Sequence, residues 1–533
     1  MMPRRRTRTT ARTRFFAILV MALASRQSLA QSSVGARARA EARLYREHNE
    51  ATIVSEFATL LAVPNLASDS INIHRNANLL MAMLEQRGFR NARLLTVTGA
   101  PPAVYAELPA EGATRTLVLY AHYDGQPLDP KQWATPPWTP VLRDRPLEQG
   151  GKEIPMPAAG STARVDPEAR IYARSAGDDK ASIMAILAAV DAMRERHIEQ
   201  SVNLKVFFEG EEEAGSGHLR QILEAHAPTL AGDAWLFCDG PVHPSGREEL
   251  VFGQRGVTGM ELTVYGPTRA LHSGHYGNWA PNPAALIANL IASMRDDDGR
   301  IKIAGYYDDV KPISPAERRA IAALPDYDVT LRKALGMAHT EANDAPLAER
   351  IMRPALNVRG IHVGGVRATG SNTIATEAYA SFDLRLVPNQ TPERVQRLVE
   401  DHIRRQGYFV THDSVTVPMR LAHAKIARVE WEHGYPASRA PMDGAFGRAV
   451  LAALNDGAPA PYLALPTMGG SGPTYLFEQV LRVPMITLPI ANYDDNQHAA
   501  NENLRVQNLW NGIETYAALL AGIGERWNPR PVP

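Results

Sequence analysis

The 533-residue sequence has a single cysteine, Cys238, and no uninterrupted apolar run approaching the roughly 20 residues that cross a bilayer. One cysteine excludes an internal disulfide and a thiolate metal cluster, so stability must come from the core. Charged residues make up only 21% of the chain and apolar residues 45%, which argues against a coiled coil or a disordered chain. The length exceeds one ordinary core and predicts two domains.

Positive charge is unevenly placed along the chain. The first 30 residues hold seven arginines, no acid, the apolar run 15–24 and a small-residue site, Ser28-Leu29-Ala30. This order predicts a signal peptide over residues 1–30, cleaved before Gln31, with a basic amphipathic tail as the alternative. We therefore expect an exported protein, periplasmic or secreted, with no membrane insertion after cleavage. The remaining 50 basic and 57 acidic residues give a net charge of −7, which argues against a nucleic-acid partner.

Apolar patterning predicts an α/β fold with a mostly parallel sheet and flanking helices. Short apolar runs at 116–120, 202–208 and 234–238 predict buried strands, and amphipathic spacing predicts helices within 41–90 and at 180–194. Residues 127–168 are rich in proline, glycine and charge, and predict a long surface excursion.

The pattern then changes and later returns. Half-exposed strands at 259–264 and 378–386, with helices at 282–294 and 392–405, predict a smaller α+β domain. A helix at 446–454, a strand at 483–488 and a helix at 504–523 resume the first pattern. The expected organisation is a discontinuous first domain, residues 31–256 and 438–533, with an inserted lid and dimerisation domain, residues 257–437.

Acids and histidines gather in five short segments that follow predicted strands or begin a helix: 120–125, 176–180, 208–216, 239 and 494–502. In open α/β sheets, ligands bind at the ends of strands. His122 and Asp124 are two apart in an extended chain and share a side, so His122 can ligate a metal while Asp124 fixes its ring.

Each segment also has a structural interpretation. Asp178 and Asp179 fit helix caps, the acidic run 211–213 fits a solvated loop, Asp239 fits a turn, and His498 fits an ordinary structural histidine. Together, however, the segments supply two histidines and several carboxylates, the donors that zinc, manganese or cobalt uses in hydrolytic sites. With two metals, one carboxylate must bridge ions roughly 3.5–4 Å apart.

From about residue 45 to the end, and in the same motif order, the sequence resembles the carnosinase-like dinuclear zinc peptidases. Their relatives include succinyl-diaminopimelate desuccinylase and a glutamate-releasing carboxypeptidase. The resemblance implies these roles: His122 and Asp239 on one metal, Glu213 and His498 on the other, Asp178 rather than Asp179 bridging both, Glu212 as general base, Asp124 orienting His122, and Glu211 as a solvated neighbour.

The resemblance also assigns roles to residues in the inserted domain and beyond it. It implies that His272, in Leu271-His272-Ser273-Gly274, reaches a neighbouring subunit's site and polarises the scissile carbonyl. It places Thr373 and Arg385 against the substrate, and Gly470 and Ser471 in the loop that receives the substrate's carboxylate end. A homodimer formed through the lid follows from this reading. A plain loop histidine and a structural ion pair are the alternatives for His272 and Arg385.

The expected function is metal-dependent hydrolysis of an amide bond in a small peptide, by a water held between two divalent ions with Glu212 as base. Zn²⁺ is the expected metal, with Mn²⁺ or Co²⁺ as alternatives. The nearest rival is an N-acyl amino acid deacylase or desuccinylase on the same scaffold. A catalytically dead binding protein is the remaining alternative; it predicts loss of a ligand or the base, whereas all candidates are present.

Overall fold

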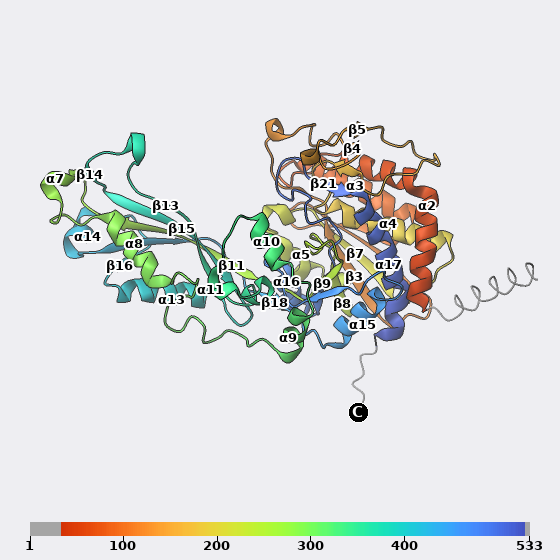
Figure 1. Cartoon of the computed structure of the whole chain (residues 1–533). Coiled ribbons are helices and arrows are strands. Elements are labelled where there is room, and N and C mark those ends of the chain that lie inside the picture. Colours follow the sequence, from red (N-terminus) through yellow and green to blue (C-terminus); the bar gives the residue numbers. More distant parts are fainter. Residues whose placement is uncertain (1–32, 528–533) are drawn as a thin grey trace, which may run out of the picture.

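The computed structural model describes residues 33–527, so the predicted signal peptide and its cleavage site lie outside the described residues. Figure 1 shows two lobes: a large lobe on the right, which contains both ends of the described chain, and a small lobe on the left. No helix between residues 33 and 527 has both the length and the apolar character needed to cross a bilayer.

An eight-stranded sheet forms the centre of the large lobe. Its order is β1 (Arg90–Leu95), β2 (Ala103–Leu108), β7 (Asn203–Glu209), β3 (Thr116–His122), β8 (Ala234–Phe237), β20 (Met485–Thr487), β9 (Glu249–Val251) and β19 (Leu463–Leu465). The strands β7, β3, β8 and β20 run parallel, so their carboxyl ends meet at one edge. These central strands are buried on both faces, which explains their continuous apolar runs.

Helices cover both faces of this sheet (Figure 1). One face packs against α2 (Val34–Leu61), α3 (Ser70–Gln86), α4 (Lys180–Glu195), α15 (Ala445–Leu454) and α17 (Val506–Arg526). The other packs against α5 (Leu219–Ala225), α6 (Ala227–Leu230) and α16 (Thr474–Leu481). The long helices α2 and α17 lie against each other, so the first and last described elements close one core.

The small lobe has its own sheet and its own apolar core. The sheet order is β13 (Ala355–His362), β15 (Glu377–Leu386), β11 (Gly256–Tyr265), β17 (Ile426–Trp431) and β16 (Phe409–Thr411). Two helices cover one face, α8 (Pro283–Met294) and α13 (Pro392–Arg405). The far end carries β12 (Leu271–His272), β14 (Thr373–Ile374), α7 (Ser273–Tyr276) and α14 (Val417–Ala422). The short pair β10 (Gly253–Gln254) and β18 (Ser438–Arg439) lies where the chain passes between lobes.

The predicted α/β class with flanking helices is confirmed, and the strands and helices expected from the pattern are present. The excursion 127–168 is more structured than expected. It contains η1 (Pro130–Gln132), β4 (Val141–Arg143), η2 (Leu147–Gln149) and β5 (Glu153–Ile154). The strands β4 and β5 join β6 (Arg170–Tyr172) and β21 (Asn503–Arg505) in a four-stranded sheet. Strands of two or three residues are too short to show a period of two, which is why the pattern concealed them.

A second segment was not anticipated from the pattern. Between α8 and β13 the chain forms α9 (Pro315–Ala322), α10 (Asp328–Ala334), α11 (Glu341–Asp344) and α12 (Leu347–Arg350). We call residues 315–352 the cover segment. It leaves the small lobe and packs beside the large one, where α9 contacts β19 (Figure 1).

Candidate metal centre

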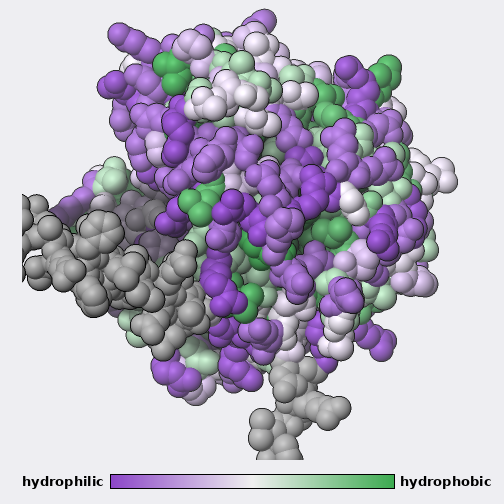
Figure 2. Space-filling view, turned by 90° about the vertical axis from the view of Figure 1, so that its right-hand side faces the viewer, coloured by the Kyte–Doolittle hydropathy of each residue, from purple (hydrophilic) through white to green (hydrophobic). Residues whose placement is uncertain are grey.

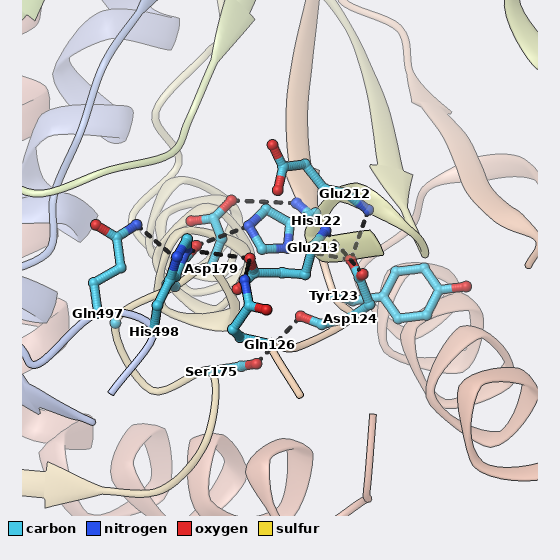
Figure 3. A network of polar contacts seen from close by, with 12 residues as sticks. His122, Tyr123, Asp124, Gln126, Ser175, Asp179, Glu212, Glu213, Gln497 and His498 are labelled. Carbon is cyan, nitrogen blue, oxygen red and sulfur yellow. Dashed lines mark hydrogen bonds and ion pairs between the residues drawn. The ribbon is translucent and has the colours of Figure 1, made fainter. Parts of the chain in front are cut away.

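The carboxylate of Asp178 lies at the carboxyl edge of the large sheet, between His122 and His498, the two histidines labelled in Figure 3. Its Oδ1 is 2.8 Å from Nε2 of His122, which ends β3, and its Oδ2 is 3.1 Å from Nε2 of His498. The same Nε2 of His498 is 3.1 Å from Oε2 of Glu213. Residues more than 370 positions apart in sequence therefore meet around one aspartate.

All five predicted ligands come together in two overlapping groups. Ligand atoms of His122, Asp178 and Asp239 lie within 4.8 Å of one another, and so do those of Asp178, Glu213 and His498. Asp178 is common to both groups, whereas Asp179 points elsewhere and accepts a hydrogen bond from the His122 backbone at 3.2 Å. This is the arrangement that two ions sharing one carboxylate require.

Asp124 connects the first group to the acidic run. Its Oδ1 is 3.3 Å from Nδ1 of His122, and its two oxygens accept hydrogen bonds from the backbone N–H groups of Glu212 and Glu213 at 3.0 and 3.1 Å. The Asp124 side chain is fully buried. It therefore fixes both the ring of His122 and the short helix η3 (Glu212–Ala214) that carries the predicted base.

The expectation that Glu211 is a solvated neighbour is wrong. Glu211 is only 5% exposed, and it accepts hydrogen bonds from the backbone N–H of His218 at 2.6 Å and from its Nδ1 at 2.9 Å. The reason is local: the chain turns back after Glu211, which places the start of α5 over its carboxylate. Glu211 thus stabilises the turn that presents Glu212 and Glu213.

Glu502 joins the two halves of the site. Its buried carboxylate accepts hydrogen bonds from the backbone N–H groups of Ser175, Gly177 and Asp178, each at 3.0 Å, and from Arg174 at 2.7 Å. Glu502 ends the same loop that carries His498. One carboxylate therefore holds the backbone of Asp178 against the loop of His498.

In the metal-free site, several carboxylates surround two imidazoles, and this arrangement together with burial shifts the pKa values of these groups. Burial disfavours the charged ring of His122, but Asp124 and Asp178 outweigh burial and raise its pKa well above the ordinary value. Asp178 and Glu213 raise the pKa of His498 to about 10. Burial, reinforced by Asp178, raises the pKa of Asp239 to about 7. Without cations, the site holds protons at neutral pH.

The donors present fit divalent cations. Oδ1 of Asp239 is buried and makes no hydrogen bond within residues 33–527. Several carboxylates converge where only the histidines supply positive charge, which is costly unless cations neutralise them. Imidazole and carboxylate together form a donor set for zinc, manganese or cobalt.

Comparison with known proteins agrees with this geometry. The model of peptidase family M20/M25/M40 matches residues 118–522, a range that includes both lobes and every predicted ligand. The chain belongs to peptidase family M20/M25/M40. The match covers more than half of the chain, so the assignment does not depend on one motif.

Relatives of this peptidase align over most of their length. A Cys-Gly metallodipeptidase of Schizosaccharomyces pombe is 28% identical over 439 residues, covering 79% of this chain and 83% of that protein. Human beta-Ala-His dipeptidase is 26% identical, with 78% and 75% covered. The structure of a family M20 metallo-carboxypeptidase from Sulfolobus solfataricus superposes with a TM-score of 0.71 at 27% identity, covering 89% of this chain and 99% of that one. That superposition supports the fold described above.

Three of the predicted substrate-contacting residues of this peptidase lie near the metal centre. Nη1 of Arg385, near the end of β15, donates to Oγ of Ser471 at 2.8 Å, while its Nε pairs with Asp383 at 3.0 Å. Gly470 and Ser471 line a cavity of about 730 Å³ together with Asp239 and other residues of the metal centre. Both interpretations of Arg385 thus find support, because it forms an ion pair and also reaches the predicted substrate loop.

His272 and Thr373 lie elsewhere. They pair directly across β12 and β14, at the end of the small lobe farthest from the large lobe (Figure 1). Both are exposed, and Nδ1 of His272 accepts a hydrogen bond from Gly274 at 3.1 Å. Within one chain, the structure does not bring these two residues to the metal centre.

Sequence reasoning gave no role to three residues that hold the predicted ligands. Gln497 donates to Oδ2 of Asp178 at 2.7 Å, and Gln126 donates to Oε2 of Glu213 at 2.9 Å. Glu502 is the third. The only available signal was proximity, since Gln497 and Glu502 fall in the same run as His498 and Gln126 lies two residues after Asp124.

We expect Zn²⁺ binding to the metal-free peptidase to release about two protons at pH 7, because His122 and His498 are charged there and a ligating histidine must be neutral. Raising the pH removes the competing protons, so the affinity for Zn²⁺ should rise from pH 6 to pH 9. Calorimetry in two buffers of different ionisation enthalpy measures the release. His498→Ala should reduce it and His275→Ala should not; heats that are identical in both buffers would contradict the prediction.

Proposed function

We propose that this chain is a two-metal dipeptidase that hydrolyses the peptide bond of a small peptide. The observation that carries the proposal is the pair of ligand groups that share Asp178. In this assignment His122 and Asp239 hold one ion, and Glu213 and His498 hold the other. Relatives named as dipeptidases, matched along most of both chains, favour a dipeptide as the substrate. Zn²⁺ is our choice of metal, and the same donors accept Mn²⁺ or Co²⁺.

The residues of the chain divide the work of hydrolysis. When bound, the two ions supply Lewis acidity, which lowers the pKa of a water molecule and polarises the scissile carbonyl. Glu212 takes the proton of the attacking water and returns it to the leaving amine. In the site without cations, burial raises the pKa of Glu212 well above its ordinary value. Asp124 holds the Glu212 backbone in place for this step.

Arg385 and Ser471 are suited to bind the carboxylate end of the substrate. The guanidinium of Arg385 is oriented by Asp383 and reaches the Ser471 hydroxyl at the rim of the metal centre. Gly470 precedes Ser471 in this loop, and its carbonyl accepts a hydrogen bond from the backbone N–H of Arg255 at 3.0 Å. A planar guanidinium next to a hydroxyl is a favourable partner for a carboxylate.

We further propose a homodimer in which each small lobe, residues 257–437 as an inserted domain, supplies His272 and Thr373 to the partner's site. Their distance from the metal centre of their own chain supports this, since they cannot act there in cis. Large apolar side chains are exposed on the small lobe, including Trp279 at 79% and Leu421 at 84%. In contrast, the face of the large lobe in Figure 2 is mainly hydrophilic, with apolar residues scattered among polar ones.

Glu212→Gln should lower turnover by at least about 10²-fold while both ions stay bound, because the amide cannot accept the proton. Glu213→Gln should instead weaken metal binding, since a neutral amide is a poorer ligand. Elemental analysis and initial rates on Leu-Gly measure the two effects, and the unmodified protein should contain about two ions per chain. If only Glu212→Gln lost metal, the base and the ligand would have been assigned one residue out of register along the acidic run. Full activity in both would end the catalytic assignment.

Donation of His272 between subunits can be tested with mixed dimers. A dimer of one His272→Ala chain and one Glu212→Gln chain holds one complete site, so it should recover up to about half of the activity per dimer. Differently tagged chains, co-expressed and purified through both tags, provide the sample. Each variant alone is the control. Mixed dimers no more active than those controls would remove support for donation in trans.

Export remains our proposal from the sequence of residues 1–30. Mass spectrometry of the protein from a native host should find a mature amino terminus near Gln31, because the segment before it has the order of a signal peptide. An intact Met1 on the protein from a cytosolic fraction would contradict export.

A further inference from the structure

The cavity beside the metal centre is large and is walled by two parts of the chain. Its volume is about 730 Å³, within the range of small-molecule sites. Asp178, Glu212, Asp239 and His498 of the metal centre line it, and so do residues of the cover segment. A substrate whose scissile bond lies at the metal centre would therefore place one of its residues against the cover segment.

The cover segment is fixed to the large lobe by buried contacts. Glu317 of α9 forms a 3.0 Å ion pair with Arg439 of β18, and both side chains are less than 10% exposed. At the other end, Arg255 donates to the carbonyl of Arg353 at 2.9 Å, next to the buried Met352. The part of the cavity lining that the cover segment supplies is thus held in place at both ends of that segment.

The side chains that the cover segment turns toward the cavity are mostly apolar. Ile321 belongs to α9 and Leu324 follows it, Leu331 belongs to α10, Leu347 begins α12 and Ile351 follows it. Leu347 remains 50% exposed, although a leucine in a well-packed wall would usually be covered. Leu465 and Met468 of the large lobe add to the same apolar surface. These residues offer area that an apolar side chain of the substrate would bury.

Away from the metal centre, the charged side chains that the cover segment adds to the cavity are carboxylates. Among residues 33–527, no lysine or arginine lines it, whereas Asp326 and Asp328 of the cover segment do. The buried Glu249 contributes little negative charge, because burial raises its pKa to about 8. A second cavity of about 690 Å³ shares Glu212, Ser471 and His498 with the first and is also lined by Arg220. Arg220 gives the second cavity a cationic side chain that the first cavity lacks among residues 33–527.

Resting on the proposed dipeptidase function, we propose that the cavity under the cover segment binds the amino-terminal residue of the substrate, and that this residue has a large apolar side chain and a free ammonium group. The apolar wall binds the side chain, and Asp326 and Asp328 favour the cation. An acyl group whose far end carries a carboxylate, such as succinyl, would place that carboxylate toward Asp326 and Asp328 of the cover segment, which disfavour it. The cavity thus favours peptides over succinylated amino acids.

Steady-state kinetics of the Zn²⁺-loaded mature chain tests this. Leu-Gly should exceed Ala-Gly in kcat/KM by about 10-fold or more, because even one methylene in an apolar pocket is worth that much. Asp-Gly and N-acetyl-Leu-Gly should each fall at least about 10-fold below Leu-Gly, the first through its carboxylate and the second through loss of the ammonium. N-succinyl-leucine should not be cleaved measurably.

Leu331→Ala should reduce the ratio of Leu-Gly to Ala-Gly by about 10-fold, since it removes part of the apolar wall and leaves α10 intact. The matched control is Leu335→Ala, because Leu335 follows the same helix, is 61% exposed and does not line the cavity. Both variants should keep the metal content of the unmodified protein, which elemental analysis checks.

The outcomes separate this inference from the function on which it rests. Equal rates on Ala-Gly, Leu-Gly and Asp-Gly, or equal effects of the two leucine variants, would overturn the inference and leave a dipeptidase. Cleavage of N-succinyl-leucine without cleavage of any dipeptide would overturn the dipeptidase proposal itself. If no compound is cleaved by metal-loaded protein, both fail.

Discussion

The carboxylate of Asp178 is the point on which the arrangement of this molecule depends. It lies between His122 at the end of β3 and His498 in the loop before β21. The negative charge of a buried carboxylate is tolerable only beside cations or strong donors, and here two imidazoles and Gln497 supply them. The loop of His498 is in turn tied to the backbone of Asp178 through Glu502. Moving any one of these groups would therefore leave another buried polar group without a partner.

The parallel strands explain how such a cluster can form. Because β3 and β8 are neighbours and run in the same direction, His122 and Asp239 emerge side by side from one edge. The acidic run follows β7 at that same edge. The sheet thus concentrates acids in a small volume, and these acids raise the pKa of His498, while burial, reinforced by Asp178, raises that of Asp239.

Local patterns carried most of what the sequence could predict. His122 and Asp124 follow a clear apolar run, so strand periodicity alone placed both on one side. The resemblance then selected Asp178 over its neighbour, and the structure puts Asp178 between the histidines. Glu211 was assigned wrongly because burial of its carboxylate depends on a turn that brings α5 back over it. Such a contact has no periodic signal.

The cover segment escaped prediction for a different reason. Its helices are four to eight residues long, and their apolar side chains face a cavity instead of a packed core. Amphipathic spacing needs two or three turns to be recognised. The separation of His272 from the metal centre has no signal in the residues themselves, because motif order carries no information on the distance between lobes, and only the resemblance implied a site on a neighbouring subunit.

The pairing of β8 with β20 has a consequence for how the chain folds. Trp235 lies opposite Met485, so two central strands meet across about 250 intervening residues. Closing so long a loop of unfolded chain is entropically costly, but the small lobe lies within that loop and has its own apolar core. At a synthesis rate of about 5–20 residues per second, the small lobe leaves the ribosome seconds before β20 is made. A small lobe that folds early would shorten the effective loop and bring β8 close to the segment that forms β20.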